Sequence, residues 1–265
     1  MSYPDPAGIF AGTAEDYARY RPRRPGLFLD LLAGLAPHGP IADIGAGPGS
    51  LALDLAARGR CVFAIDANPA MIAAGRRAAD ALAPSGPIHW HVADAHHLPD
   101  LPRLSGATFA DSFHWLDRAA VLEDLDLRVK PNGFVAVLMI HAAGSAKPWW
   151  YPLVENLLRM HVGPLRHAGP DQVAHVPVGD HESVLRASAF NHLTVVRTDQ
   201  TLRLSLDEVV GWQYTQAYSS PAVLGPGRAA FDADLRAELL RAAPSGQFTT
   251  TIQPGLIIAR RGEDQ

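Results

Sequence analysis

The sequence is short of cysteine and of long apolar runs. Its single cysteine, Cys61, excludes a disulfide within the chain, so no disulfide framework supports the fold. One cysteine suits a reducing cytosol, which is the compartment we expect. A membrane helix needs about 20 consecutive apolar residues. The longest apolar candidate, residues 134–140, falls well short of that length and is predicted to be a buried strand.

Charge is also scarce, and neither sign dominates. Charged residues make up 19% of the 265 residues, and the formal net charge at pH 7 is −4. A nucleic-acid-binding surface needs a cluster of lysine and arginine to neutralise phosphates, so we expect no nucleic-acid partner. Residues 1–10 lack the basic patch and apolar stretch of a secretory signal, and we expect no membrane partner either.

Histidine, in contrast, is plentiful, with 12 residues. The closest cluster consists of His91, His96 and His97. A metal site needs ligands that converge on one point, usually with a supporting acid. Since His96 and His97 are adjacent, their side chains diverge, and the sequence predicts no metal cofactor.

Predicted strands and helices alternate through the first half of the chain. Hydrophobic residues make up 48% of the sequence, which is enough for a full core. The alternation indicates a parallel sheet with right-handed crossovers. The predicted strands are residues 41–44, 61–65, 88–92, 104–109 and 134–140, and the predicted helices are 50–58, 68–82 and 117–129.

Helices are predicted before this core, and a mixed pattern follows it. Thr13 begins a helix that ends before Pro22, and Pro25 opens a second helix. After His141 we expect helices at 148–161, 180–187, 206–218 and 227–242, sheet at 192–205, and a final strand at 248–260 that Pro254 interrupts. We expect one domain over residues 1–265: lid helices at 1–37, a cofactor-binding core at 38–141, a substrate cap at 142–190, and the remaining sheet and helices at 191–265.

Three glycines follow the first predicted strand. Gly45, Gly47 and Gly49 allow a sharp turn and a close approach of a ligand to the backbone, and the next helix directs its N–H groups there. A dinucleotide fingerprint would have glycine where this chain has Ser50, and the lysine of a phosphate-binding loop is absent. The loop is therefore suited to a nucleoside that carries no phosphates.

Two carboxylates stand at the ends of the next two strands. Asp66 follows the second strand, where a carboxylate accepts hydrogen bonds from ribose hydroxyls. Asp94 follows the third strand, where a carboxylate can accept the exocyclic amine of adenine. Because the carboxyl ends of parallel strands share one edge of the sheet, the glycine loop and both acids together predict an adenosyl ligand.

These segments resemble a known family. Residues 41–50 (Ile-Ala-Asp-Ile-Gly-Ala-Gly-Pro-Gly-Ser) resemble the first motif of class I S-adenosylmethionine-dependent methyltransferases, and residues 66–71 and 92–95 resemble the second and third. Residues 17–22 and 112–118 are similar to a small-molecule, trans-aconitate-like subgroup, although Ser105 replaces the acid that relatives usually carry. The resemblance implies a Rossmann-like α/β fold: a seven-stranded, mostly parallel sheet with helices on both faces, an inserted helical cap and an N-terminal lid helix.

The resemblance also implies a cofactor and its contacts. The cofactor is S-adenosyl-L-methionine and the product S-adenosyl-L-homocysteine, with no metal. Asp43 would orient the glycine loop or the methionine ammonium, Asp66 would hold the ribose, and Asp94 with Ala95 would contact the adenine. Arg21 could pair with the methionine carboxylate. The expected cofactor contacts are Tyr20, Arg21, Asp43, Gly45, Ala46, Gly47, Asp66, Ala67, Met71, Asp94, Ala95 and Asp111.

Methyl transfer needs an aligned nucleophile and, where that nucleophile carries a proton, a base. His114 is the first candidate base because it follows the fourth strand, between two aromatic residues. The alternative is a histidine that only bonds to the backbone or the substrate. Tyr17 and Tyr20 are the next catalytic candidates, and packing on a short helix is the alternative for both.

Aromatic residues begin the predicted cap. Trp149, Trp150 and Tyr151 are consecutive, so they cannot all share one helix face, and we expect a substrate wall here, with core packing as the alternative. The expected acceptor is a small, partly aromatic metabolite of specialised metabolism, methylated on O, N or C, and the expected assembly is a monomer or homodimer. The predicted substrate contacts are Tyr17, His114, Trp115, His141, Trp149 and Trp150.

Two other functions stay open on the sequence alone. A nicotinamide-dependent oxidoreductase shares the strand, loop and helix and the acid after the second strand, but Ser50 and the lack of a Ser/Tyr/Lys catalytic set weigh against it. A protein that binds S-adenosylmethionine without transferring its methyl group would carry the same motifs.

Overall fold

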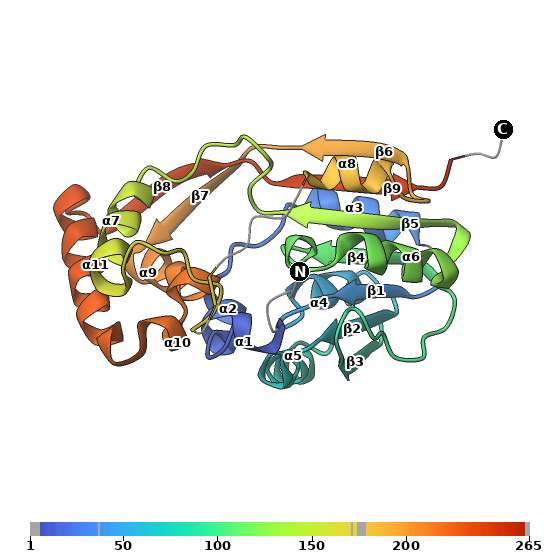
Figure 1. Cartoon of the computed structure of the whole chain (residues 1–265), viewed down its shortest axis with the longest axis horizontal. Helices are drawn as coiled ribbons and strands as arrows, with labels where there is room; N and C mark the ends of the chain where they lie inside the picture. Colours follow the sequence, from blue (N-terminus) through green and yellow to red (C-terminus); the bar gives the residue numbers. More distant parts are fainter. Residues whose placement is uncertain (1–5, 37, 171, 174–178, 263–265) are drawn as a thin grey trace.

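A mixed sheet forms the centre of the chain in the computed structural model, which describes residues 6–36, 38–170, 172–173 and 179–262. The order of its seven strands is β3-β2-β1-β4-β5-β9-β6 (Figure 1). All strands run in the same direction except β9, which pairs antiparallel with both of its neighbours, β5 and β6. The expected seven-stranded, mostly parallel sheet is confirmed. The strands are β1 (Ile41–Ile44), β2 (Val62–Asp66), β3 (Ile88–Val92), β4 (Leu104–Ala110), β5 (Val129–Met139), β6 (His192–Arg197) and β9 (Gly255–Arg260).

Helices cover both faces of this sheet. On one face, Phe28 of α3 (Gly26–Leu35) and Leu51 of α4 (Ser50–Ala56) pack into one buried apolar cluster. On the other face, Leu125 of α6 (Arg118–Arg128) and Leu185 of α8 (His181–Arg186) pack into a second. The fourteen-residue helix α5 (Pro69–Leu82) contacts β2 and β3 and has the predicted N-cap: the Asn68 side chain accepts a hydrogen bond from the Ala70 N–H.

The order of the strands reverses between β1 and β4. β1 leads on one side to β2 and β3, and β4 leads on the other to β5. Crossovers leave in opposite directions from such a point, so a crevice opens outside the carboxyl ends of the strands. The glycine loop, Asp66 and the segment after β4 all lie there.

The predicted sheet segments at 192–205 and 248–260 each divide into two strands that belong to different sheets. Residues 192–197 and 255–260 complete the main sheet, whereas β7 (Gln200–Ser205) pairs with β8 (Gln247–Ile252) in a separate antiparallel ribbon. The two segments run side by side out of the main sheet toward that ribbon (Figure 1). The interruption predicted at Pro254 is therefore where the chain passes from one sheet to the other, and the final strand is two strands with different pairing partners.

A helical cap surrounds this ribbon. Its core joins Trp150, Phe231 and Phe248 from distant parts of the sequence. Of the cap predicted at 142–190, residues 150–158 thus pack with segments after residue 200, whereas α8 packs on the main sheet. The cap contains α7 (Tyr151–Val162), α9 (Leu206–Tyr214), α10 (Pro221–Leu224) and α11 (Arg228–Ala242), with the short 3₁₀ turns η2 (Ala217–Ser219) and η3 (Gly225–Gly227).

The N-terminal helices lie between the cap and the main sheet (Figure 1). These are α1 (Pro6–Ile9) and α2 (Ala14–Tyr20), and α2 contacts both α9 of the cap and α5 of the core. The predicted helix start at Thr13 is confirmed, although the Thr13 hydroxyl donates to the Phe10 carbonyl instead of capping the helix. Among the described residues, no helix combines the length and apolarity that a membrane crossing requires.

One strand begins earlier than predicted. Residues 130–133, between the helix predicted at 117–129 and the strand predicted at 134–140, are part of β5, because Val129 already pairs with Leu104 of β4. The register then shifts, so that Phe134 pairs with Gly106. The irregularity absorbs the extra residues that the Lys-Pro-Asn-Gly sequence introduces.

Candidate active site

The glycine loop joins β1 to α4 in a left-handed backbone conformation. Gly45 has φ +66° and Gly47 has φ +58°, where side chains with a Cβ are strained. A Cβ at Gly45 would lie 2.5 Å from Cβ of Ser112, so the end of β4 comes close there. At Gly47 the nearest atom to such a Cβ is Cε1 of Tyr17, at 3.9 Å. The loop therefore packs tightly against Ser112 at Gly45, whereas it leaves space beside Gly47.

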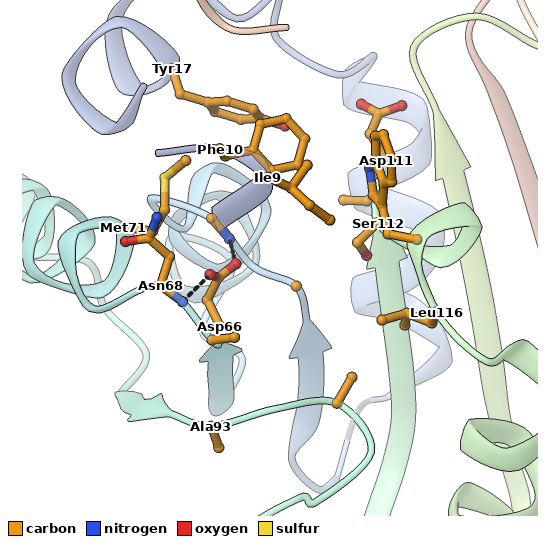
Figure 2. Close-up of a pocket in the computed structure, with 16 residues that line it drawn as sticks. Ile9, Phe10, Tyr17, Asp66, Asn68, Met71, Ala93, Asp111, Ser112 and Leu116 are labelled. Carbon is orange, nitrogen blue, oxygen red and sulfur yellow. Dashed lines mark hydrogen bonds between the residues drawn. The ribbon is translucent and has the colours of Figure 1, made fainter. Parts of the chain in front are cut away.

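Asp66 holds this loop in place. Its Oδ2 accepts a hydrogen bond from the Gly47 N–H at 2.8 Å, and its Oδ1 accepts one from the Asn68 N–H at 2.8 Å (Figure 2). Burial raises the pKa of Asp66, and these two N–H bonds oppose the rise. The carboxylate thus binds two loops together while it faces the same pocket as they do.

A small pocket of about 70 Å³ lies above the loop. The side chains of Ile9, Phe10 and Tyr17 cover it from the N-terminal helices (Figure 2). Of the predicted cofactor contacts, Gly45, Gly47, Asp66, Ala67, Met71, Ala95 and Asp111 line it, together with Asn68, Ala93, Ala110, Ser112, Trp115 and Leu116.

Asp43 lies beneath the pocket, fully buried in β1. The Thr108 hydroxyl donates to its Oδ1 at 2.9 Å, while Oδ2 has no hydrogen-bond partner among the described residues. Burial raises the pKa of Asp43 to about 6, against the lowering effect of the Thr108 hydrogen bond. The next residues in the loop are fixed by the backbone, since the Ala46 N–H donates to the Ile65 carbonyl.

Asp94 stands beside the pocket, whose wall here is made by Ala93 and Ala95. Its Oδ1 meets both the backbone N–H of His96, at 2.9 Å, and the ring Nδ1 of His96, at 2.8 Å. Burial raises the pKa of Asp94, but the hydrogen bonds from His96 outweigh it, and the pKa lies below its usual value.

Asp111 is held by two arginines at the end of β4. Its Oδ2 lies 3.2 Å from Nη2 of Arg21 and 3.3 Å from Nη2 of Arg24, and all three side chains are buried. Its Oδ1 accepts the Ile140 N–H at 2.9 Å, and its φ of +57° is unusual for a residue with a side chain. Burial raises the pKa of Asp111, yet the two arginines hold it below its usual range. Arg21, predicted to pair with a cofactor carboxylate, pairs here with Asp111.

Tyr20 faces the cap instead of the small pocket. A Cβ at Gly211 of α9 would lie 2.3 Å from the Tyr20 ring, so the ring rests directly on that helix. Tyr17, one turn earlier on α2, lines the small pocket. The two tyrosines named as catalytic candidates therefore occupy different surroundings.

A second cavity, of about 870 Å³, opens between the sheet, α8 and the cap. Phe10, Asp111 and Trp115 line both this cavity and the small pocket, so the two spaces meet at these side chains. The other lining residues include the predicted His114 and His141, and also Arg21, Arg118, Met139, Arg166, His167, His181, Arg197 and Tyr218.

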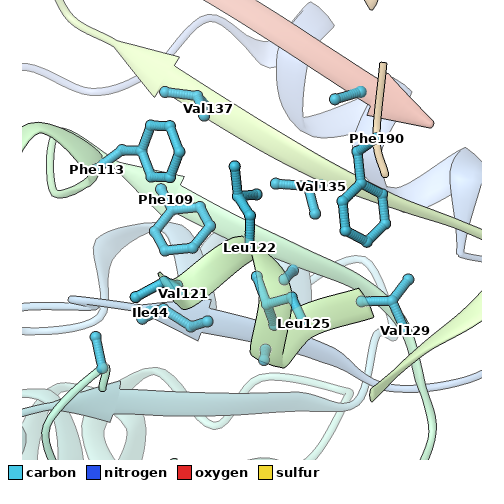
Figure 3. Close-up of a cluster of buried hydrophobic side chains, with 14 of the residues drawn as sticks. Ile44, Phe109, Phe113, Val121, Leu122, Leu125, Val129, Val135, Val137 and Phe190 are labelled. Carbon is cyan, nitrogen blue, oxygen red and sulfur yellow. The ribbon is translucent and has the colours of Figure 1, made fainter. Parts of the chain in front are cut away.

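His114 is presented to the large cavity by the 3₁₀ turn η1 (Phe113–Trp115). Phe113 points into the core, 4.8 Å from the Phe109 ring (Figure 3), which anchors the turn. Burial lowers the pKa of His114 to about 4, so its ring is neutral at pH 7. The His181 ring, 6.3 Å away, also has a pKa lowered to about 4 by burial. No motif in the sequence marks His181, which only follows the predicted helix start at Asp180.

The tryptophans predicted as a substrate wall lie elsewhere. Trp150 is 1% exposed and packs in the cap core. Trp149 is 47% exposed and stacks on Phe248. Neither lines the small pocket or the large cavity. Across the described part of the chain, no three His, Cys, Asp or Glu side chains gather as metal ligands.

The chain is similar to known proteins in part of its sequence and in its fold. Residues 41–133 match the family model described as the methyltransferase domain, and no curated protein matches the chain. An S-adenosylmethionine-dependent methyltransferase from Geobacter sulfurreducens, in complex with S-adenosyl-L-homocysteine, is similar over 96% of this chain and 98% of its own, at 15% identity and a TM-score of 0.54. One from Thiobacillus denitrificans, in the same complex, is similar over 98% and 100%, at 15% identity and a TM-score of 0.53. Residues 41–133 therefore match a methyltransferase domain, and the chain shares the fold of these solved S-adenosylmethionine-dependent methyltransferases.

Proposed function

We propose that this enzyme binds S-adenosyl-L-methionine above the glycine loop and transfers its methyl group to a small molecule in the large cavity. The observation that supports this most directly is the meeting of the two spaces at Phe10, Asp111 and Trp115. In-line displacement needs donor and acceptor in adjoining sites that exclude water. The solved methyltransferases with S-adenosyl-L-homocysteine share the fold.

The residues at the small pocket fit such a cofactor. Gly47 leaves room that a Cβ would fill. Asp43 offers a buried carboxylate oxygen without a partner among the described residues, suited to a methionine ammonium directly or through water. Asp66 lines the pocket as the ribose acceptor, and its existing N–H bonds orient it. When bound, the cofactor supplies an electrophilic methyl group on a sulfonium.

The large cavity fits a metabolite better than a macromolecule. Its volume of about 870 Å³ lies within the about 300–1,000 Å³ of small-molecule sites. Trp115 and Tyr218 supply aromatic surface, and His114 supplies a neutral imidazole. We propose a partly aromatic acceptor methylated on oxygen, nitrogen or carbon, and His114 as the group that takes the proton when the nucleophile carries one.

We propose a small-molecule partner only, without nucleic acid or membrane, a reducing cytosol as compartment and specialised metabolism as context. A monomer or homodimer is expected, which light scattering on the purified protein measures. A higher assembly would contradict that part.

Calorimetric titration with S-adenosyl-L-homocysteine, and separately with a nicotinamide cofactor, tests the cofactor. We expect micromolar binding of the first and none of the second; the reverse result would make the protein an oxidoreductase. Incubation with S-adenosyl-L-methionine and pooled phenols, amines and carboxylic acids should then release S-adenosyl-L-homocysteine with an acceptor. Tight binding without release in any pool would favour a protein that binds the cofactor without transferring its methyl group.

A further inference from the structure

His96 bridges two parts of the site that are distant in the sequence. On one side its backbone N–H and its ring Nδ1 both meet Oδ1 of Asp94, at 2.9 and 2.8 Å. On the other side its ring Nε2 lies 3.1 Å from the backbone N–H of Asp117. Asp117 is the N-cap of α6 and follows directly on the turn that carries His114.

The two neighbours fix the tautomer of this ring. A backbone N–H can only donate, so Nε2 must accept the bond from Asp117. The single ring proton of a neutral imidazole then resides on Nδ1, where it donates to the Asp94 carboxylate. Both ring nitrogens are used, and rotation of the ring by 180° would break both bonds. The imidazole is therefore a directional link between Asp94 and Asp117.

The same contacts orient Asp94. Among the described residues, the donors to its carboxylate both meet Oδ1, which leaves Oδ2 for a ligand. The Asp94 side chain is 36% exposed and the His96 side chain 25%, so neither is held by deep packing. A half-exposed carboxylate would otherwise sample several rotamers, and the cost of ordering it would reduce the affinity for a ligand that it binds.

We propose that His96 is a positioning residue that holds Asp94 for adenine recognition and ties that carboxylate to the start of α6. The inference rests on the proposed function, because it needs an adenosyl cofactor beside Asp94. His97 supplies the matched control, since it is the adjacent histidine and its side chain is exposed.

The test compares two ligands by calorimetry: S-adenosyl-L-homocysteine and its analogue in which unsubstituted purine replaces adenine. The wild-type protein should prefer the adenine ligand about tenfold or more, the value of a hydrogen bond to a charged group. His96→Ala should reduce this preference to about threefold or less while the purine analogue binds within twofold of wild type. Asp94→Ala should abolish the preference, and His97→Ala should leave it intact.

A second variant separates positioning from mere support of the loop. His96→Asn places an amide N–H near the position of Nδ1 but offers nothing at Nε2. It should retain most of the adenine preference, while the Asp117 amide exchanges its hydrogen faster than in wild type. An equal loss of affinity for both ligands in His96→Ala, or an unchanged preference, would overturn the inference. Absence of S-adenosyl-L-homocysteine binding in the wild-type protein would overturn the proposed function itself.

Discussion

Asp66 is the residue on which cofactor affinity should depend most strongly. It lines the small pocket and also accepts the N–H groups of Gly47 and Asn68. Asp66→Ala removes the ribose acceptor and leaves those two donors without their partner. At about 1.5–3 kcal/mol for each hydrogen bond to a charged group, affinity for S-adenosyl-L-homocysteine should fall roughly 100-fold by calorimetry. Asp80→Ala, an exposed acid of α5, is the control, and unchanged affinity in Asp66→Ala would remove the ribose assignment.

Asp43 should make cofactor binding depend on pH. Burial raises its pKa to about 6 from 3.8, so below pH 6 the free protein holds this carboxyl protonated. A methionine ammonium favours the carboxylate, and binding at low pH must therefore release the proton. The dissociation constant for S-adenosyl-L-homocysteine should rise by up to about tenfold between pH 7 and pH 5.

Asp43→Asn isolates this effect, because the amide has no proton to release in that range. The variant should bind more weakly than wild type at pH 7 but with a flatter dependence between pH 7 and pH 5. A dependence as steep in the variant as in wild type would assign the titration to another group, such as Asp66, whose pKa is also raised by burial.

Site residues that act through local sequence could be predicted. Asp66 is the last residue of β2 and Gly47 lies in the loop just after β1, and a strand end fixes where such residues lie. The partners of Arg21 and His96 could not be predicted in this way. Arg21 meets Asp111, and His96 meets Asp117, only because the fold brings separate loops to one edge of the sheet. Contacts between residues so far apart in the sequence produce no motif of fixed spacing from which they could be predicted.

At the scale of elements, the turn from β1 into α4 depends on a glycine for two separate reasons. Gly49 has φ +77°, and a Cβ there would lie 2.3 Å from the Trp90 ring. Gly59 has a similar φ of +76°, but nothing lies within 4 Å of its Cβ position. Gly59→Ala should therefore cost only the backbone strain, about 1–2 kcal/mol.

Gly49→Ala should cost that strain and the displacement of the tryptophan ring, which adds about 1–3 kcal/mol. The difference between the two variants is measured by urea unfolding, with the midpoint and slope fitted for each. Equal losses would mean that Trp90 yields without cost and does not fix the loop.

The positions of helices and strands were predicted better than the pairing of the strands. Helix α5 has the expected start and end, and Asn68-Pro69 is a strong cap signal for its start. Residues 200–205 also form a strand, but the sequence did not show that they pair with residues 247–252 outside the main sheet. Strand propensity depends on local residue types, whereas the choice of sheet depends on contacts made across the whole chain.

At the scale of the molecule, the N-terminal helices connect the core to the cap, since α2 contacts both α5 and α9. Ile9, Phe10 and Tyr17 cover the small pocket, whose volume of about 70 Å³ is below the about 300–1,000 Å³ of ordinary ligand sites. Entry of a nucleoside from the side that these three side chains cover therefore requires the N-terminal helices to move. The movement must break the contacts that hold α2 between the core and the cap.

Arg21 makes the most central of these contacts. Its Nη2 pairs with Asp111 at the end of β4, and its Nη1 donates to the Thr215 hydroxyl after α9 at 3.4 Å. Arg21→Ala should loosen α2 from both layers, since removal of one partner of a buried ion pair costs about 3–5 kcal/mol. Release of S-adenosyl-L-homocysteine, followed through tryptophan fluorescence in stopped flow, should then become roughly tenfold faster or more, and amides of α2 should exchange faster.

Arg228→Ala is the control. It removes an exposed ion pair to Asp16 of α2 and should leave release unchanged, because exposed pairs contribute little. Equal release rates in the two variants would mean that the lid opens without breaking the Arg21 contacts.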